Sequence, residues 1–202
     1  MILRDVPVTP TDRVTVDAGA MDVAVMDAGV TDVGGAQFDV DLNRAYPTGP
    51  LGGGVGNVVG RFTLPDCAGQ PYDFGGVEFQ RTRATLFAVF TGTCTTCAAD
   101  ARALQALHAQ YAPRGVRTVA VMLEGSAPME QPTASFCQQW RTASGATHPI
   151  LLDVSRSLDY LSPTRAYPVI LVIDAFGTVR GRYVAQGSWA TSARALLDGL
   201  TP

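Results

Sequence analysis

The chain has 202 residues and a formal net charge of −3, from 15 basic and 18 acidic side chains. This slight excess of acid makes nucleic acids and anionic membrane surfaces unfavourable partners. Every basic residue is an arginine, which excludes chemistry based on a lysine nucleophile. No apolar run is long enough to span a bilayer, and we expect a soluble monomer.

The first 57 residues differ in composition from the rest. A five-residue period runs through an Ala-, Gly- and Val-rich stretch without basic residues, marked by Asp17, Asp22, Asp27 and Asp32. This period matches neither a helical face nor a strand face. The sequence therefore predicts an acidic low-complexity linker over residues 1–57, with a flexible glycine-rich joint at 47–56, before one domain at 58–202. A calcium-binding repeat is the less favoured alternative, because each Asp lacks companion oxygen ligands.

The remaining chain alternates strand and helix patterns. The apolar run 84–90 predicts a buried strand, and the spacing of Leu104, Leu107 and Tyr111 predicts a helix over 98–111. Further along, the pattern predicts a strand at 116–123, a helix from Pro132 to about Ala143, a strand at 149–153, a hairpin of 169–174 with 178–184, and a helix at 190–200. This order is that of an α/β domain.

Two cysteines stand between the first of these strands and the first helix. Cys94 and Cys97 are three residues apart, a spacing that favours a reversible disulfide. The N-terminus of a helix stabilises a thiolate, and the thiolate is the species that attacks disulfides. We therefore expect Cys94 to attack a partner and Cys97 to resolve the mixed disulfide. The cysteine pair carries the electrons, so no metal and no organic cofactor is expected.

Two further segments carry a family resemblance. The sequence RAYPVILVIDAFG at 165–177 is similar to the segment that bears a cis-proline in thioredoxin-like proteins, and GRFTLPDCAGQ at 60–70 resembles the N-terminal hairpin of TlpA-like and peroxiredoxin-like members. Over residues 58–200 the chain resembles a TlpA-like thiol-disulfide oxidoreductase with a redoxin domain. The resemblance implies a thioredoxin-like α/β fold, in which helices flank a central mixed sheet and an N-terminal hairpin is added. It also implies disulfide exchange with partner proteins and with a separate redox partner protein.

The resemblance implies roles for residues around the cysteines. Pro168, in a cis bond, would shape the substrate groove, and Tyr167 would contact the backbone of the partner. The threonines of the motif would line this substrate site: Thr93, Thr95 and Thr96. Relatives usually carry Trp and Pro where this chain has Thr93 and Thr96, and residues next to the cysteines help set the reduction potential, so the direction of electron flow stays open.

Asp100 stands where TlpA-like proteins often carry a glutamate. A carboxylate close to the thiols could relay protons during exchange. The alternative is that Asp100 only complements the dipole of the first helical turn.

Two other functions fit parts of the pattern. Thr91, three residues before Cys94, also resembles the peroxidatic motif of peroxiredoxins, in which case Arg165 is the nearest arginine to assist the thiolate. A metal carrier, for example for copper, would combine the CxxC pair with a histidine. Only His108 and His148 are available for that purpose.

Cys67 and Cys137 are the two remaining cysteines. Once the CxxC pair is set aside they are the natural partners of a second disulfide. Buried free thiols that pack as small apolar groups are equally consistent with the sequence.

The compartment is inferred indirectly. Residues 1–5 lack the apolar stretch of a signal peptide. An acidic tether before a TlpA-like domain nevertheless resembles the spacer of a bacterial envelope lipoprotein. We therefore expect the cell envelope or periplasm, with membrane tethering through a lipid anchor on an N-terminal segment missing from this sequence.

Overall fold

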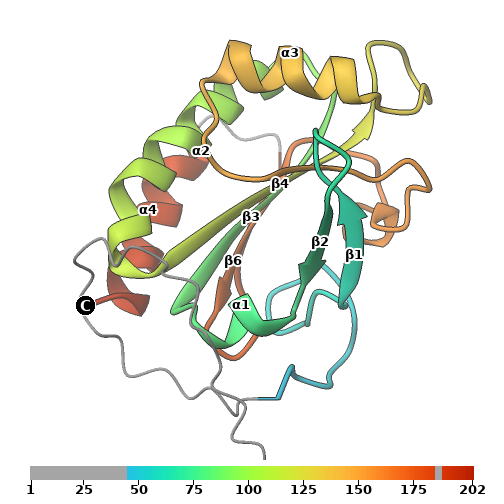
Figure 1. Ribbon diagram of the computed structural model, residues 1–202. Helices are drawn as coiled ribbons and strands as arrows, with labels where there is room; N and C mark the ends of the chain where they lie inside the picture. Colours follow the sequence, from blue (N-terminus) through green and yellow to red (C-terminus); the bar gives the residue numbers. More distant parts are fainter. Residues whose placement is uncertain (1–44, 185–187) are drawn as a thin grey trace, which may run out of the picture. The chain divides into compact units, whose positions relative to one another are not determined.

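The computed structural model describes residues 45–184 and 188–202. Its elements follow the predicted alternation of strands and helices (Figure 1). In chain order they are β1 (Phe62–Pro65), β2 (Pro71–Phe74), α1 (Val77–Gln80), β3 (Ala84–Thr91), α2 (Cys97–Tyr111), the 3-10 turn η1 (Ala112–Arg114), β4 (Val116–Glu124), α3 (Ala134–Ser144), β5 (Ile150–Leu152), the 3-10 turn η2 (Asp159–Leu161), β6 (Val169–Asp174), β7 (Val179–Val184) and α4 (Trp189–Leu200).

A five-stranded mixed sheet forms the centre of the domain, in the order β5-β4-β3-β6-β7. Strands β3, β4 and β5 are parallel, whereas β6 runs antiparallel to β3 and β7 antiparallel to β6. All residues of β3 are buried, as its continuous apolar sequence predicts for a central strand. This topology places the carboxyl ends of β3, β4 and β5 and the amino end of β6 at the same end of the sheet.

The two faces of the sheet bury separate apolar clusters. Leu86, Ala88 and Phe90 of β3 pack with residues of α2, α3 and α4 on one face. Phe87 and Val89 point to the other face, where they pack with residues of the β1–β2 hairpin. Figure 1 shows α2 and α4 beside each other on the helical face, with the hairpin on the opposite side. The fold is the predicted thioredoxin-like α/β fold with an added N-terminal hairpin.

The boundaries of α3 differ slightly from the prediction. The helix begins at Ala134 rather than at Pro132, because Thr133 is extended and its side chain accepts a hydrogen bond from the backbone N–H of Phe136. Thr133 is therefore the N-cap. Gly145, with a φ of 69°, ends the helix as predicted.

Residues 47–56, for which the sequence predicts a flexible joint, make backbone hydrogen bonds with the domain. The backbone N–H of Gly52 donates to the carbonyl of Val58, and the backbone N–H of Gly56 donates to the carbonyl of Val179 in β7. Gly53 is buried so closely against the backbone of Leu161 that a Cβ would lie 2.8 Å from its carbonyl oxygen. The glycines here allow close packing rather than flexibility. The rest of the predicted linker, residues 1–44, lies outside the described residues.

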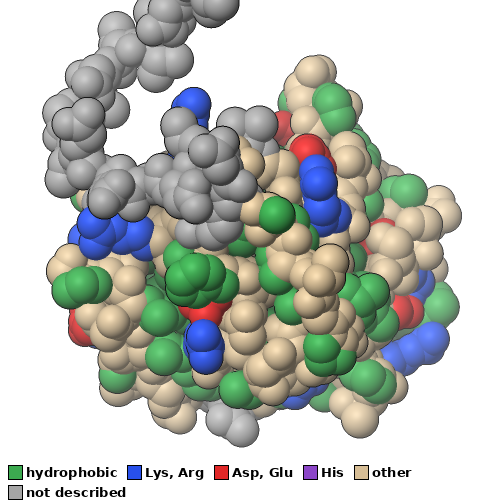
Figure 2. Space-filling model, turned by 90° about the horizontal axis from the view of Figure 1, so that it is seen from below, with side chains coloured by type: hydrophobic (Ala, Val, Ile, Leu, Met, Phe, Trp, Pro, Cys, Tyr) green, Lys and Arg blue, Asp and Glu red, His purple; other side chains and the backbone are tan. Residues whose placement is uncertain are grey.

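Among the described residues, no helix combines the length and apolar character needed to cross a membrane. The face of the molecule seen from below in Figure 2 carries arginine and acidic side chains dispersed among apolar and polar ones.

Candidate active site

The CxxC pair lies between β3 and α2, at the end of the sheet where β3, β4 and β5 have their carboxyl ends. The structure joins Cys94 and Cys97 in a disulfide, with their Cα atoms 5.3 Å apart. Cys97 is the first residue of α2 and is fully buried, whereas Cys94 is half-buried and lies before the helix. Of the two sulfur atoms, that of Cys94 is therefore the accessible one. This asymmetry matches the predicted attacking and resolving roles.

Gly92 makes the turn into the motif possible. A Cβ at this position would collide with the carbonyl oxygen of Gly125 and with the ring of Phe136. The loops that follow β3 and β4 thus approach each other at backbone distance, which only glycine permits. The close approach brings Glu124, the last residue of β4, beside the motif.

The segment before β6 forms the other side of the site. The Tyr167–Pro168 peptide bond is cis, the geometry implied by the resemblance. The carbonyl oxygen of Tyr167 lies 3.5 Å from Sγ of Cys94. In the reduced protein a Cys94 thiol can donate a hydrogen bond to this carbonyl.

A groove of about 440 Å³ opens beside Cys94. Its lining includes all four residues predicted to contact substrate, namely Thr93, Thr95, Thr96 and Tyr167. Thr91, Glu124 and Arg165 complete it. Sequence reasoning missed Glu124, although its place directly after an apolar strand was a signal that it would reach the same end of the sheet as the cysteines.

Two charged residues that sequence reasoning also missed lie behind the groove. Arg156 forms ion pairs with Glu124 at 2.6 Å and with Asp159 at 2.9 Å. Burial alone would raise the pKa of Asp159, but the hydrogen bonds and charge of Arg156 outweigh it and hold that pKa below its usual value. Burial, followed by the negative charge of Asp159, raises the pKa of the Tyr167 hydroxyl to about 12.

Asp100 is buried one helical turn after Cys97. Its carboxylate accepts a hydrogen bond of 2.7 Å from Nε1 of Trp189, at the start of α4. A buried carboxylate costs free energy unless it is hydrogen-bonded. Trp189 therefore supplies the partner that lets an acidic side chain lie beneath the motif.

The second cysteine pair is joined as well. Cys67, in the turn between β1 and β2, forms a disulfide with Cys137 of α3, and their Cα atoms are 5.4 Å apart. Both residues are buried. Burial keeps this bridge away from thiols in solution, so its position suits a structural link between the hairpin and the helical face.

The histidines do not approach the cysteines. His108 lies eleven residues along α2 from Cys97, a distance of about 16 Å at the rise of an α-helix, and it contacts the ring of His148 with ring centroids 5.5 Å apart. Burial lowers the pKa of His148 to about 4. Within 45–184 and 188–202, no group of three or more His, Cys, Asp or Glu is arranged to hold a metal. The histidines therefore lie too far from the CxxC pair to share a metal ion with it, and the predicted alternative of a metal carrier that uses these residues together is wrong.

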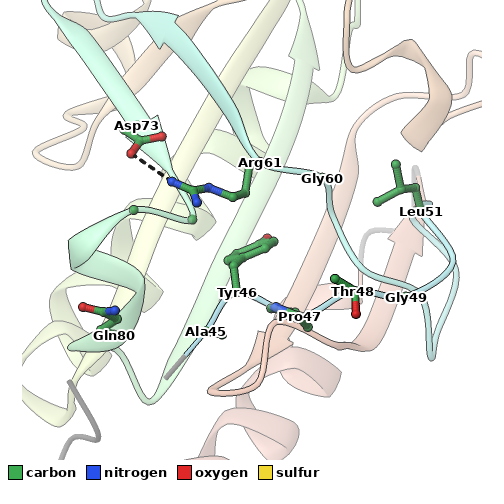
Figure 3. Close-up of a pocket in the computed structure, with 12 residues that line it drawn as sticks. Ala45, Tyr46, Pro47, Thr48, Gly49, Leu51, Gly60, Arg61, Asp73 and Gln80 are labelled. Atoms are coloured by element: carbon green, nitrogen blue, oxygen red, sulfur yellow. Dashed lines mark ion pairs between the residues drawn. The ribbon is translucent and has the colours of Figure 1, made fainter. Parts of the chain in front are cut away.

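A larger pocket lies elsewhere, against residues 45–51 and the β1–β2 hairpin. It has a volume of about 820 Å³ and shares no lining residue with the groove beside Cys94. Figure 3 shows its main polar feature, the ion pair of Arg61 with Asp73, whose atoms are 3.5 Å apart. Tyr46 lines it too, but its hydroxyl already donates to the carbonyl of Val59. The lining holds no cysteine, so the redox chemistry belongs to the smaller groove.

A CxxC disulfide at the start of the helix that follows a central strand, with a cis-proline segment beside it, defines the thioredoxin-like class of thiol-disulfide oxidoreductases. Residues 55–182 match the AhpC/TSA family. The chain belongs to this family. A comparison with curated proteins gives no significant match.

Solved structures share the fold. A candidate thiol:disulfide interchange protein DsbE from Chlorobium tepidum superposes with a TM-score of 0.61 at 15% identity, covering 74% of this chain and 99% of that one. A thioredoxin-family thiol:disulfide interchange protein from Chlorobium tepidum TLS gives a TM-score of 0.57 at 18% identity, covering 71% and 95%. A secreted disulfide oxidoreductase of Mycobacterium tuberculosis homologous to E. coli DsbE gives 0.52 at 18% identity, covering 69% and 93%.

Proposed function

We propose that the protein exchanges disulfides with partner proteins through Cys94 and Cys97. The observation that carries this proposal is the asymmetry of the pair: Cys94 faces a groove, and Cys97 is buried behind it. A groove beside the accessible sulfur can hold the chain of a partner, while the buried sulfur is protected from reacting with a second partner.

The exchange proceeds in two balanced steps. The Cys94 thiolate attacks one sulfur of a partner disulfide, which forms a mixed disulfide and releases the other partner sulfur as a thiolate. The Cys97 thiolate then attacks Sγ of Cys94, which re-forms the disulfide seen in the structure and releases the second partner sulfur. Two electrons pass to the partner, and the reverse sequence oxidises it. The disulfide itself is the electron carrier, and the direction follows from the potentials of the two pairs.

We propose that Asp100 assists the second step. Its carboxylate is held by Trp189 in the first turn of the helix that begins with Cys97. In our proposal it accepts the proton of Cys97 when that thiol becomes the attacking thiolate, and returns it in the reverse reaction.

The test uses insulin as the disulfide substrate and dithiothreitol as the reductant. We expect the wild type to accelerate insulin reduction and Cys94→Ser to abolish the acceleration. Cys97→Ser should accumulate a mixed disulfide through Cys94, which mass spectrometry detects in the absence of reductant. Acceleration that persists in Cys94→Ser would contradict the proposal.

A second candidate function is reduction of peroxides. It is favoured by the family match and by the presence of Thr91 and Arg165 in the same groove as Cys94. The Cys94 thiolate would attack one peroxide oxygen and break the O–O bond, giving a sulfenic acid and a hydroxide ion that takes a proton from solvent. The Cys97 thiol would then condense with the sulfenic acid to the same disulfide and water. Dimedone labelling of Cys97→Ser after a millisecond exposure to hydrogen peroxide decides whether this reaction is fast.

We place the protein in the cell envelope or periplasm. All four cysteines are in disulfides, and a buried structural disulfide is typical of oxidising compartments. One structural neighbour is described as secreted. Fractionation of the native cells tests the compartment, and release from membranes only by detergent supports a lipid tether.

A further inference from the structure

Arg156 is held in an unusual conformation by three charged hydrogen bonds. Its φ is 57°, in the left-handed region that non-glycine residues rarely adopt. Its side chain is only 15% exposed. The guanidinium donates to Glu124 through Nη1 at 2.6 Å, and to both oxygens of Asp159 at 2.9 and 3.0 Å. A residue stays in such a conformation only where its surroundings compensate for the strain.

The two carboxylates that Arg156 binds, those of Glu124 and Asp159, contact opposite sides of the groove beside Cys94. Glu124 lines the groove and lies 3.4 Å from the hydroxyl of Thr93. Asp159 accepts a hydrogen bond of 3.2 Å from the hydroxyl of Tyr167. The carbonyl of that same tyrosine lies 3.5 Å from Sγ of Cys94. The guanidinium of Arg156 thus connects the end of β4, through Glu124, with the segment before β6, through Asp159 and Tyr167.

Backbone strain is concentrated around this groove. Among the described residues, the other non-glycine residues with positive φ are Met129 at 61° and Arg165 at 52°. Their side chains meet, with Nη1 of Arg165 3.8 Å from the sulfur of Met129, and Arg165 lines the groove. All three strained residues therefore stand in loops at the end of the sheet that bears Cys94, the pattern expected where a functional geometry is imposed on the chain.

We propose that Arg156 is a positioning residue, which fixes both walls of the groove that receives the polypeptide partner. This inference rests on the proposed disulfide exchange. Arg156 does not touch the reacting sulfur atoms; it acts through Glu124 on one wall and through Asp159 and Tyr167 on the other. Its fork of donors matters because a guanidinium can bind one carboxylate with two nitrogens and another with the third.

The proposal predicts different effects on the reaction with a polypeptide and on the reaction with a small dithiol. A polypeptide has to lie in the groove to bring its disulfide to Cys94, so it depends on the position of both walls. Dithiothreitol reaches the half-buried sulfur of Cys94 without filling the groove. Loss of Arg156 should therefore weaken the reaction with a protein far more than the reaction with a small dithiol.

The experiment compares Arg156→Gln, which removes the charge, with Arg156→Lys, which keeps the charge but loses the fork. Arg180→Gln is the matched control, because Arg180 also pairs with a buried aspartate, Asp174, away from the groove. For each protein, kcat and KM are measured with insulin under dithiothreitol recycling. The rate constant for reduction of the Cys94–Cys97 disulfide by dithiothreitol alone is measured in a single turnover.

We expect Arg156→Gln to raise the KM for insulin about tenfold, and to change the dithiothreitol rate constant by no more than about twofold. Arg156→Lys should give an intermediate KM, and Arg180→Gln should match the wild type in both measurements. An unchanged KM, or a dithiothreitol rate that falls by the same factor as the insulin rate, overturns the role of Arg156.

A substitute variant and the behaviour of the wild type allow the experiment to distinguish failure of the Arg156 role from failure of the proposed function. If Arg156→Gln does not fold by circular dichroism, Asp159→Asn takes its place. It removes the ion pair through which Arg156 reaches Tyr167 and leaves the ion pair with Glu124, so it should give the same separation of insulin from dithiothreitol. If the wild type is reduced by dithiothreitol but does not reduce insulin, the proposed function itself fails and the role of Arg156 fails with it. A wild type that reduces insulin, with Arg156 variants that match it, overturns the role of Arg156 alone.

Discussion

Replacing Cys67 and Cys137 together by alanine removes the bridge between the β1–β2 turn and α3. The bridge closes a loop of 70 residues along the sequence. The chain-entropy relation assigns about 4 kcal/mol of stabilisation to a loop of this length, and about 2 kcal/mol to the three-residue loop closed by Cys94 and Cys97. Because Cys67 and Cys137 are buried, the alanines also leave unfilled space, which adds to the loss.

The matched control is the double variant Cys94→Ala/Cys97→Ala, which removes the same atoms from the short loop. Guanidinium unfolding followed by tryptophan fluorescence gives the free energy of unfolding of each protein. We expect Cys67→Ala/Cys137→Ala to lose about 2 to 3 kcal/mol more than the control, yet to keep its insulin reductase activity. Equal losses in the two double variants, or activity lost only with Cys67 and Cys137, would refute the assignment of the Cys67–Cys137 bridge to stability and of the Cys94–Cys97 pair to chemistry.

Other predictions concern the buried polar groups. Trp189→Phe removes the hydrogen bond to Asp100 and should lower the free energy of unfolding by about 2 kcal/mol, because a buried carboxylate loses its partner. The double variant Trp189→Phe/Asp100→Asn should recover part of this loss. Asp100→Asn alone should slow release of the mixed disulfide without affecting its formation, measured by quenched-flow alkylation. His148 has a folded pKa near 4, below its unfolded value of 6.5, so the unfolded state binds the proton more tightly. Stability should therefore fall as the pH drops from about 6.5 to 4, by up to about 3 kcal/mol, and His148→Gln should flatten this dependence in unfolding curves.

The sequence predicted the elements whose patterns are local. The apolar run 84–90 became β3, the stripe of Leu104, Leu107 and Tyr111 became the buried side of α2, and Gly145 ended α3. In each case one physical cause dominates, either burial of one face or a glycine with positive φ. The cysteine motif was predicted for the same reason, because its chemistry depends on a strand before it and a helix after it.

The missed features depend on contacts between distant segments. Residues 47–56 have the glycine content of a flexible joint, and only their packing against Leu161 and Val179 shows that they belong to the domain. Arg156, which stands in a loop with no motif of its own, gains its place from Glu124 and Asp159. The pairing of Cys67 with Cys137 was left open since it required the hairpin turn to reach α3, which no local pattern reveals.

The central claim is that Cys94 and Cys97 form a disulfide that exchanges with other thiols, and its most direct test is their equilibrium reduction potential. The protein is incubated in glutathione and dithiothreitol buffers of graded potential, alkylated, and analysed by peptide mass spectrometry. We predict a two-electron transition of this pair between about −270 and −120 mV, with Cys67 and Cys137 still joined throughout that range. A pair that never joins, or one that stays oxidised below about −300 mV as structural disulfides do, would contradict the account.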